Sequence, residues 1–440
     1  MYIKKEGAAI LMSILKKIVL LLVISAIVES ASFAAYHYFA TGPLKEAFLS
    51  HEKDLRDNVL PPVESIDLEN GEWTKVARFE SAFYEVSLVV GILFSFFIAW
   101  LIIFGGVSSA LANLAKRLYR NVHAQRSYYL LGMVLLSTFI ALPTYVSDYY
   151  IELLRGTSNI TPLLAVEDLV LNLFLEFVFA IATFIPLYWI MDKYPRAWWA
   201  LGAAFLTLFS IFTGYIAPVV IDPLFSRNVP LEDSVLKEKI ITLADSAGIS
   251  VDRVFVEDAS TRTLESNAYM TGLWSTKRVV LDDTLLTYYT DDEILAILGH
   301  ELGHYVKHDM WRGIVQYAIE TFISLGLLAL ILWYVLKKWG KRIGSTRVND
   351  IVLYPFLGVI LSTMSLLAAP IDSAISRDIE HKADVFGFEL THATKPAITS
   401  FRKMTYQSFV DPDPPRFLQW WFGTHPTMKE RIEFLENATF

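Results

Sequence analysis

The sequence predicts a predominantly α-helical membrane protein that crosses the bilayer seven times and carries a small α+β portion in its polar parts. Apolar residues make up 54% of the 440-residue chain, and the mean hydropathy is +0.41. They gather in stretches of about twenty residues with few charges, the length that a helix needs to cross the hydrocarbon layer. These stretches lack the amphipathic stripe and the frequent charges of helices buried in a soluble protein.

Seven stretches fit a membrane-spanning helix. They cover residues 18–40, 82–105, 129–147, 168–191, 197–221, 313–336 and 351–372. The first follows four lysines and ends among small residues, so a cleaved signal peptide is the alternative interpretation. Its apolar run continues through Phe39, which favours a retained anchor.

The polar stretches divide the chain into four parts. Residues 1–226 hold five membrane helices, 227–312 form a polar segment, 313–372 hold membrane helices six and seven, and 373–440 form a C-terminal helical segment. Three of the membrane stretches contain or adjoin an acidic residue, namely Glu29, Glu85 and Glu176. Such residues are costly in lipid and are compatible with a water-filled interior or with a position near an interface.

The polar segments are predicted to contain both helices and strands. In 227–312 we expect a helix near 231–247, a strand at 253–256, a strand pair at 267–271 and 278–281, and a long helix from Asp291 to beyond His308. Asp291 and Asp292 suit the start of that helix, where carboxylates meet free N–H groups and the positive end of the dipole. In 373–440 we expect one helix over 376–390 and another after Pro426.

Charge sets the expected orientation and excludes some partners. One side of the seven-helix arrangement carries about fifteen Lys and Arg residues and the short loops of the other side about six, so the N-terminus is predicted in the cytoplasm and both polar segments outside it. A net charge of −8 without a basic stripe argues against a nucleic-acid partner. The chain contains no cysteine, which excludes disulfides, thiolate nucleophiles and Cys-ligated metal.

The sequence His300-Glu301-Leu302-Gly303-His304 fits the HExxH pattern. Residues four apart share one face of a helix, so both imidazoles can bind one ion while Glu301 reaches the water to be activated. His308 extends the same face, but an ion held between the first two histidines lies too far along the axis for it. The pattern predicts a zinc-dependent peptidase in which Glu301 is the general base.

A catalytic zinc ion needs a third protein ligand and an open position. Without cysteine this ligand is His, Asp or Glu, and Glu380 is the best candidate. Asp384 lies four residues later on the same predicted helix face and is expected to accept the free N–H of a ligand histidine. Arg377, one turn earlier, is expected to steady a carboxylate or the polarised substrate oxygen. His381 faces elsewhere on that helix.

Four motifs occur in an order that resembles a known family. HELGH is preceded by SNAYMTGLWSTKRVVLDDTLL and followed by two membrane segments, by SRDIEHKAD and finally by THPTMKERIEFL. Together with the PVVIDPLFS stretch at Pro218–Ser226, this order resembles the integral-membrane zinc proteases of the type one CAAX prenyl protease family, which process prenylated proteins. The resemblance covers roughly residues 215–440, and the seven helices agree with it.

The resemblance implies a zincin-like catalytic domain and a chamber enclosed by the seven helices. The implied ligands of one zinc ion are His300, His304 and Glu380, with Glu301 as general base.

The resemblance also implies a substrate-binding strand and a further catalytic histidine. Asn267 is implied to contact the substrate backbone, and His425 to lie near the reacting carbonyl. An extended peptide can add to a strand edge at Asn267, Ala268 and Tyr269. The alternatives are that these residues form only a turn into a core hairpin and that His425 is a helix-start residue before Pro426.

Three functions remain open from the sequence. The first is an endopeptidase that cleaves near the C-terminus of prenylated, CAAX-type or other membrane-delivered substrates. The second has the same chemistry without prenyl specificity, in the quality control of membrane proteins, and the predicted outward orientation of the site favours it. The third is a non-enzymatic transporter or scaffold, which predicts a fourth metal ligand from the protein and a dispensable Glu301. The sequence does not predict an oligomeric state.

Overall fold

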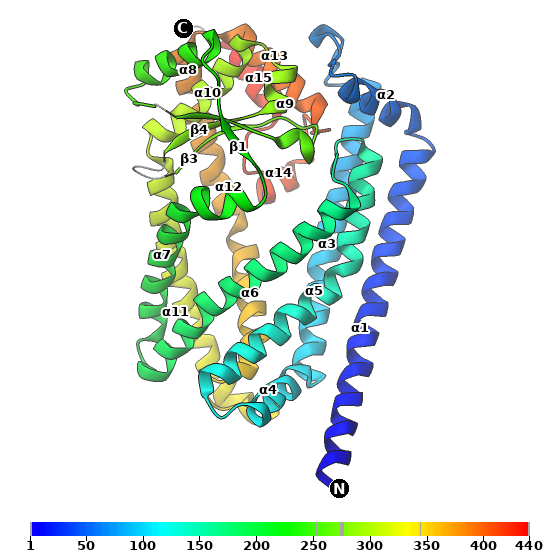
Figure 1. Cartoon of the computed structure of the whole chain (residues 1–440), viewed down its shortest axis with the longest axis vertical. Helices are drawn as coiled ribbons and strands as arrows, with labels where there is room; N and C mark the ends of the chain where they lie inside the picture. The colour runs from blue at the N-terminus through cyan, green and yellow to red at the C-terminus, as the bar shows by residue number, and fades with distance from the viewer. Residues whose placement is uncertain (1, 252, 273–276, 344, 439–440) are drawn as a thin grey trace.

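The computed structural model describes residues 2–251, 253–272, 277–343 and 345–438. Figure 1 shows long helices in the lower part of the molecule and a small sheet covered by short helices above them. We call the upper part the cap; it comprises the described residues of 42–71, 225–308 and 373–438. We call the long helices below it the membrane half.

Seven helices are long and apolar enough to cross a membrane within the described residues, which confirms the predicted multi-pass membrane protein. They are α1 (Tyr2–Thr41), α3 (Glu72–Phe104), α5 (Val122–Arg155), α6 (Pro162–Lys193), α7 (Trp198–Ile216), α11 (Asp309–Ile343) and α12 (Tyr354–Thr391). Most extend beyond the predicted apolar stretch, because polar residues continue a helix once it leaves the hydrocarbon layer.

Two elements that the sequence predicted separately are one helix. α12 continues without interruption from the membrane segment through residues 376–390, so the prediction of two separate helices at 351–372 and 376–390 was wrong. Pro370 lies inside α12 and cannot donate a hydrogen bond to the carbonyl of Leu366. The indole Nε1 of Trp421 donates to that carbonyl instead, at 3.1 Å, which removes the cost of leaving it unpaired.

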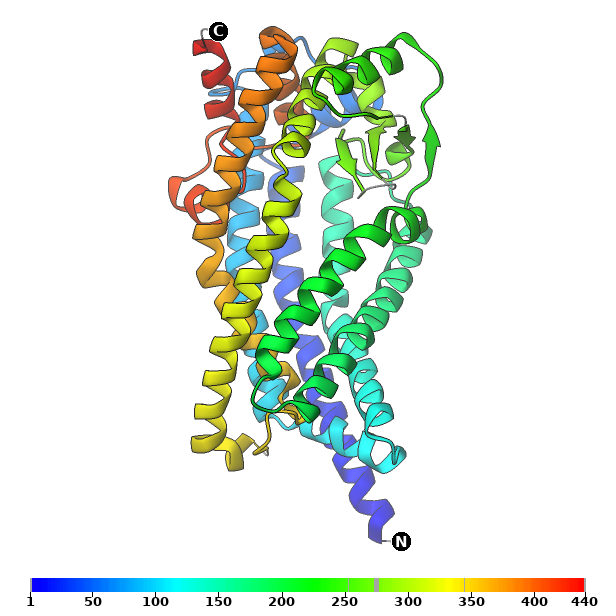
Figure 2. The same cartoon turned by 90° about the vertical axis from the view of Figure 1, so that its left-hand side faces the viewer.

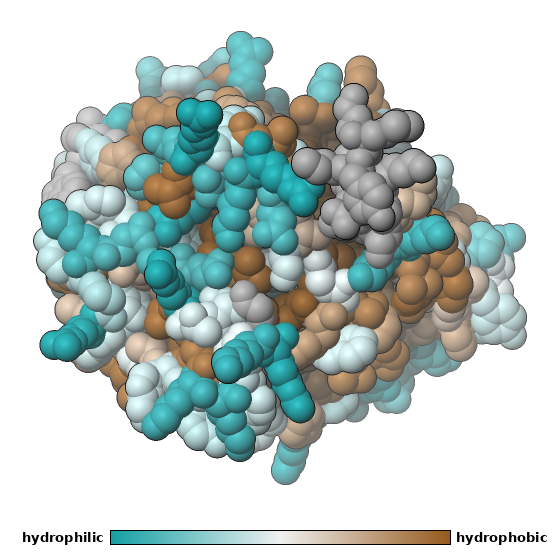
Figure 3. All heavy atoms as spheres, turned by 90° about the horizontal axis from the view of Figure 1, so that it is seen from below, coloured by the Kyte–Doolittle hydropathy of each residue, from teal (hydrophilic) through white to brown (hydrophobic). Residues whose placement is uncertain are grey.

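The N-terminus and the cap lie at opposite ends of the molecule (Figures 1 and 2). This agrees with an odd number of membrane crossings before the cap; the side that faces the cytoplasm stays a prediction. Figure 3 looks onto the N-terminal end and shows hydrophilic residues spread over it. The connections at this end include α4 (Val107–Leu118) and η6 (Ile351–Leu353) and carry most of the Lys and Arg residues outside the cap.

The cap contains a mixed four-stranded sheet in the order β1-β2-β4-β3. Its strands are β1 (Asn228–Pro230), β2 (Val254–Glu257), β3 (Ala268–Thr271) and β4 (Arg278–Asp282). β2 and β4 are parallel, and both outer pairs are antiparallel. The predicted strands lie within a residue of their observed places. The sequence missed β1, because three residues ending in proline give no strand signal.

One face of the sheet packs against helices of the cap. Val254, Val279 and Leu281 form a buried cluster with Ile294 and Leu298 of the HExxH helix. Further helices of the cap are α8 (Val235–Ser246), η4 (Ala259–Thr261), α9 (Asp283–Tyr288), α10 (Asp291–Val306), α13 (Thr394–Gln407), α14 (Arg416–Phe422) and α15 (Met428–Asn437). α8 starts four residues later than predicted because Ser234 caps it by accepting a hydrogen bond from Lys237 N.

The connection between the first two membrane helices belongs to the cap. It contains α2 (Lys45–Arg56) and η1 (Val63–Ser65), which contact the C-terminal part of the chain. His51 Nε2 lies 2.9 Å from the carbonyl oxygen of Tyr406, and the Tyr288 hydroxyl donates to the carbonyl of Leu55 at 2.6 Å. Residues distant in sequence therefore share one core, while the four-part division of the chain stays a prediction.

A cavity of about 1850 Å³ lies among α1, α3, α5 and α12. Its wall is mostly apolar, and its charged lining residues gather toward the cap: Glu29, Glu80, Asp148, Glu152 and Arg155. Of the three acidic residues noted in the membrane stretches, Glu29 lines this cavity, whereas Glu85 and Glu176 are not among its lining residues. Seven apolar helices with a cavity between them and a small mixed sheet above confirm the predicted fold class.

Candidate metal centre

α10 presents the two histidines of the HExxH pattern. The Thr290 side chain accepts a hydrogen bond from Glu293 N, and the Glu293 side chain accepts one from Thr290 N, which closes a capping box at the start of the helix. Asp291, Asp292 and Glu293 lie in the first turn, where the helix dipole favours negative charge. One turn then separates His300 from His304, and their ring centroids lie 4.7 Å apart.

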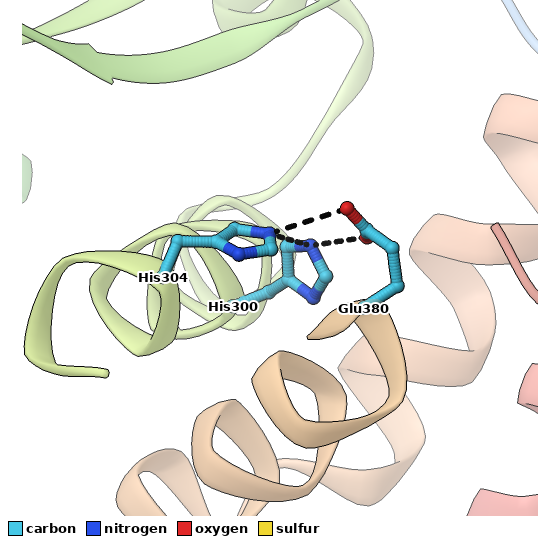
Figure 4. A group of neighbouring side chains, drawn as sticks. All are labelled: His300, His304 and Glu380. Carbon is cyan, nitrogen blue, oxygen red and sulfur yellow. Dashed lines mark hydrogen bonds and ion pairs between the residues drawn. The ribbon is translucent and has the colours of Figure 1, made fainter. Parts of the chain in front are cut away.

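Glu380 of α12 points at the two imidazoles (Figure 4). Its Oε2 lies 3.2 Å from His300 Nε2, and its Oε1 lies 3.5 Å from His304 Nε2. The two Nε2 atoms are 3.1 Å apart. Three atoms of metal-ligand type, from two helices far apart in sequence, therefore lie within 4.8 Å of one another.

The outer nitrogen of each imidazole is held by a carboxylate. His300 Nδ1 lies 2.8 Å from Asp384 Oδ1, and His304 Nδ1 lies 3.1 Å from Asp309 Oδ2. A carboxylate at Nδ1 favours the tautomer with its proton there, which fixes the ring and leaves Nε2 free to bind a metal.

These residues fit a divalent metal ion. Glu380 Oε2 is buried and accepts no hydrogen bond, although a buried carboxylate oxygen without a partner is costly. A cation bound among Glu380 and the two Nε2 atoms supplies that partner. Two imidazoles and one carboxylate are the donor set of a catalytic zinc site.

The charges around the site favour a cation. Burial lowers the pKa of His300, but the nearby carboxylates of Asp384 and Glu380 outweigh it and raise that pKa to about 9. Burial raises the pKa of Glu301, although the two imidazoles oppose that shift. The site therefore stabilises positive charge at its centre and keeps beside it a carboxylate that takes up a proton more readily than an exposed one.

α10 and α12 approach each other closely where the ligands lie. A Cβ atom on Gly387 would lie 2.6 Å from His300 N, which is closer than atoms can pack. A Cβ atom on Gly303 would lie 3.1 Å from the backbone of Ala383. Glycine at these positions lets the two helix backbones come near enough for Glu380 to reach the histidines.

Comparisons with known proteins agree with this site. Residues 230–439 match the family described as Peptidase family M48, and residues 53–227 match the family described as CAAX prenyl protease N-terminal, five membrane helices. A metalloprotease of Bacillus subtilis, named as uncharacterised, is 31% identical over 79% of this chain and 82% of its own length. The chain belongs to peptidase family M48.

Other relatives extend the similarity of this M48 chain to both halves of the molecule. The CAAX prenyl protease 1 of Saccharomyces cerevisiae is 30% identical over 69% of this chain and 70% of its own length. The crystal structure of Ste24p from S. mikatae superimposes with a TM-score of 0.73 at 25% identity, over 94% of this chain and 98% of that one. The protein is therefore a multi-pass membrane metalloprotease with the fold of Ste24p.

Asp384 has the partner that the sequence predicted, and a second partner that it did not. Arg431 of α15 donates from Nε to Asp384 Oδ2 at 2.9 Å and from Nη2 to Oδ1 at 2.5 Å. Its guanidinium also lies over the Phe401 ring, 4.1 Å from the centroid. The motif at the C-terminal end of the M48 region contains Arg431, but no local pattern connects it with Asp384.

Asp309 was missed because the helix was predicted too long. α10 ends at Val306, and His308 adopts a left-handed backbone conformation with φ of 59°. The predicted helix to beyond His308 was therefore wrong, and His308 does not continue the face of the two ligands. The chain turns at His308, and Asp309 at the start of α11 returns to His304.

His425 lies beside the metal-ligand cluster, whereas Arg377 lies against the backbone of the segment that leads to it. His425 Nε2 is 3.3 Å from Glu380 Oε2. Arg377 Nη1 donates to the carbonyl oxygens of Gln419 at 2.9 Å and Gly423 at 2.6 Å. These partners differ from the carboxylate or substrate oxygen expected for Arg377. His381 packs on the Phe434 ring, with centroids 4.8 Å apart, consistent with no role as a ligand.

The predicted substrate-binding residues lie on or next to an outer strand of the sheet. β3 pairs with β4 on one side and ends the strand order on the other. The Ala268 side chain is buried in the core, and the Tyr269 hydroxyl donates to Glu257 Oε2 at 2.6 Å. Asn267 Oδ1 accepts a hydrogen bond from Ala268 N at 2.9 Å. The strand edge therefore offers mainly its backbone to a peptide.

Proposed function

We propose that this M48 protein is a zinc endopeptidase that hydrolyses a peptide bond near the C-terminus of membrane-delivered substrates, including prenylated ones of the CAAX type. The observation that carries the proposal is the convergence of His300, His304 and Glu380 within 4.8 Å, with both outer imidazole nitrogens held by carboxylates. A bound zinc ion supplies Lewis-acid chemistry at this point, which polarises the scissile carbonyl and acidifies a water molecule.

Glu301 is the proposed general base. It takes a proton from the attacking water as the oxygen adds to the carbonyl carbon, and it passes that proton to the amine nitrogen as the C–N bond breaks. Its raised pKa supports this role, because the carboxyl group must hold the proton between the two steps. His425, beside Glu380, is the proposed donor to the developing oxyanion.

The outer edge of β3 is the proposed binding site for the substrate backbone. An extended peptide can add to an exposed strand edge through main-chain hydrogen bonds. The buried Ala268 side chain and the internally bonded Tyr269 support recognition by backbone rather than by these side chains. Asn267, at the start of β3, is proposed to contact the same backbone.

Prenyl specificity is supported by relatives named CAAX prenyl protease 1 and by an apolar cavity of about 1850 Å³ beside the cap. A protease without prenyl specificity, acting in quality control, is the second candidate. It is favoured by the excess of Lys and Arg at the end opposite the cap. The third possibility drawn from the sequence, a transporter or scaffold, finds no support in membership of a peptidase family.

Two fluorogenic peptides with a CAAX end, identical except for a farnesyl group on the cysteine, test this proposal with purified protein in nanodiscs. We expect the farnesylated peptide to be cleaved faster. Glu301→Gln should keep its zinc and lose at least about 100-fold in activity. The matched control is Glu389→Gln, an exposed carboxylate of α12, which should retain activity.

Each other outcome rejects a defined part of the proposal. Equal cleavage of the two peptides rejects prenyl specificity and favours the quality-control candidate. Full activity of Glu301→Gln rejects the mechanism. A preparation that binds no zinc but cleaves both peptides rejects the metal site.

A further inference from the structure

α14 (Arg416–Phe422) has an unusual surface for a helix of the cap. Five of its seven residues are apolar, and four of these are aromatic. Phe417 is 60% exposed and Trp420 is 52% exposed, and they lie three residues apart on one face of the helix. Arg416 is exposed at the start of the same helix. The side chains of Phe417 and Trp420 thus point away from the protein instead of into the core of the cap.

The opposite face of α14 is hydrogen-bonded to the membrane-spanning part of α12. Trp421 Nε1 donates to the Leu366 carbonyl that Pro370 leaves free, at 3.1 Å, and Ser373 Oγ donates to the Trp421 carbonyl at 3.0 Å. Leu366 lies within the last apolar turns of that membrane helix. Figures 1 and 2 show α14 at about the height where α7 ends. α14 therefore lies at the boundary between the membrane half and the cap.

We propose that α14 is an interfacial helix that binds the lipid bilayer, with Phe417 and Trp420 between the acyl chains and Arg416 at the phosphate groups. Aromatic residues with a neighbouring basic residue are the composition that the headgroup region of a bilayer favours. Contact with lipid also accounts for the exposed aromatic face, which water would disfavour. Leu366 and Ser373 hold α14 beside the end of the membrane-spanning part of α12.

A short series of side-chain contacts connects α14 with the metal centre. Arg377 of α12 holds the carbonyls of Gln419 and Gly423, and Gln419 Nε2 donates to the carbonyl of His425 at 2.7 Å. His425 Nε2 in turn lies 3.3 Å from Glu380. Arg377 and Gln419 are thus positioning residues for His425. In this proposal the bilayer holds α14, which begins the segment that they fix. On the other side of α14, Phe422 lines the cavity.

The absence of cysteine from the chain allows a direct test with single nitroxide labels. Phe417→Cys and Trp420→Cys are labelled in nanodiscs and compared with two references of similar exposure. Val235 of α8 is 67% exposed on the cap, and Leu93 of α3 is 65% exposed in the middle of a membrane helix. Leu93 is not among the residues that line the cavity, so its label samples lipid.

The measured quantity is the ratio of collisions with oxygen, which enters lipid, to collisions with a water-soluble nickel chelate. We expect the ratio at Phe417 and Trp420 to lie between that at Val235 and that at Leu93. A ratio equal to that of Val235 overturns the proposal, because α14 then faces water. Shielding of both labels from oxygen and from nickel also overturns it, because a protein partner or a second copy then covers the helix.

A second measurement keeps the aromatic side chains in place. The protein is labelled with 5-fluorotryptophan, and the Trp420 resonance is assigned with Trp420→Phe. Lipids with a nitroxide near the headgroup should broaden this resonance more than lipids with a nitroxide at the chain end. Broadening by neither lipid overturns the proposal, and neither measurement depends on peptidase activity.

Discussion

The cap and the membrane half of this protein are packed in opposite ways. In the cap, buried and partly buried charged side chains form close pairs: Arg431 binds Asp384 through two nitrogens, and Lys403 Nζ lies 2.7 Å from Glu293. In the membrane half, four helices separate around a cavity of about 1850 Å³. The comparison indicates that close side-chain and backbone contacts are concentrated around the metal-ligand cluster, whereas the membrane half leaves space between its helices.

The two parts of α12 show the same contrast between close packing in the cap and open space in the membrane half. A Cβ atom on Gly387, in the cap part of α12, would collide with the backbone of His300. A Cβ atom on Gly358, in the membrane part of the same helix, would meet nothing within 4 Å. The same residue type therefore permits close contact in one half and merely borders open space in the other.

The largest expected effect comes from removing the ligand that α12 contributes. Glu380→Gln should abolish tight zinc binding and lower activity by about 1000-fold, since a metal contributes several kcal/mol to such a reaction. Zinc per chain is measured by mass spectrometry, together with the initial rate. Glu389→Gln on the same helix should change neither quantity, and a fully active Glu380→Gln would contradict the assignment of the ligand.

The next effect tests the packing contrast directly. Gly387→Ala should force α10 and α12 apart and lower activity by about 100-fold, because a displacement near 1 Å is enough to misalign the reacting groups. Gly358→Ala should raise the midpoint of thermal unfolding slightly, because alanine favours a helix by about 1 kcal/mol over glycine. Equal behaviour of the two variants would remove the contrast between the two halves.

A smaller effect is the loss of stability of the cap at acidic pH. Burial lowers the pKa of His51 to about 4, below its ordinary value, so the unfolded chain binds the proton more readily. Stability is then complete above about pH 6.5 and is lost as the pH falls toward 4, by about 2 kcal/mol at pH 5. Thermal midpoints from pH 8 to pH 5 measure it. His51→Gln should flatten the curve, while His308→Gln, an exposed control, should leave it unchanged.

The smallest effect comes from Asp309, which supports a ligand without binding the metal. Asp309→Asn should weaken zinc affinity by about tenfold, because the carboxylate no longer fixes the imidazole of His304. Competition with a fluorescent chelator measures this affinity. Asp378→Asn, which removes an exposed carboxylate paired with Lys382, is the matched control. Unchanged affinity in Asp309→Asn would show that the contact is structural only.

The sequence predicted the features that depend on local spacing or on composition. The membrane helices follow from long apolar stretches, and His300, Glu301 and His304 follow from the i and i+4 geometry of one helix. Glu380 was found because the absence of cysteine left few ligand types and because Asp384 repeats the same spacing. These residues meet as expected, although their roles stay predictions until they are tested.

The features that the sequence missed depend on contacts between distant segments. Asp309 reaches His304 only because the chain turns at His308, in a left-handed conformation that residues other than glycine seldom adopt. Arg431 pairs with Asp384 across a gap that no periodicity reveals. α12 was divided in two because its pairing of Trp421 with the Leu366 carbonyl, which makes Pro370 tolerable, cannot be read from either segment alone.

Because α12 is continuous, it also sets a fixed distance between the end of its apolar stretch and the metal-ligand cluster. Eight residues separate Asp372, where the apolar stretch has ended, from Glu380, so the helix rises about 12 Å between them. An extended peptide covers the same height with about three or four residues. For the membrane-anchored substrates proposed above, the scissile bond has to reach this fixed height, so the proposal makes the distance from anchor to bond a first criterion of selection.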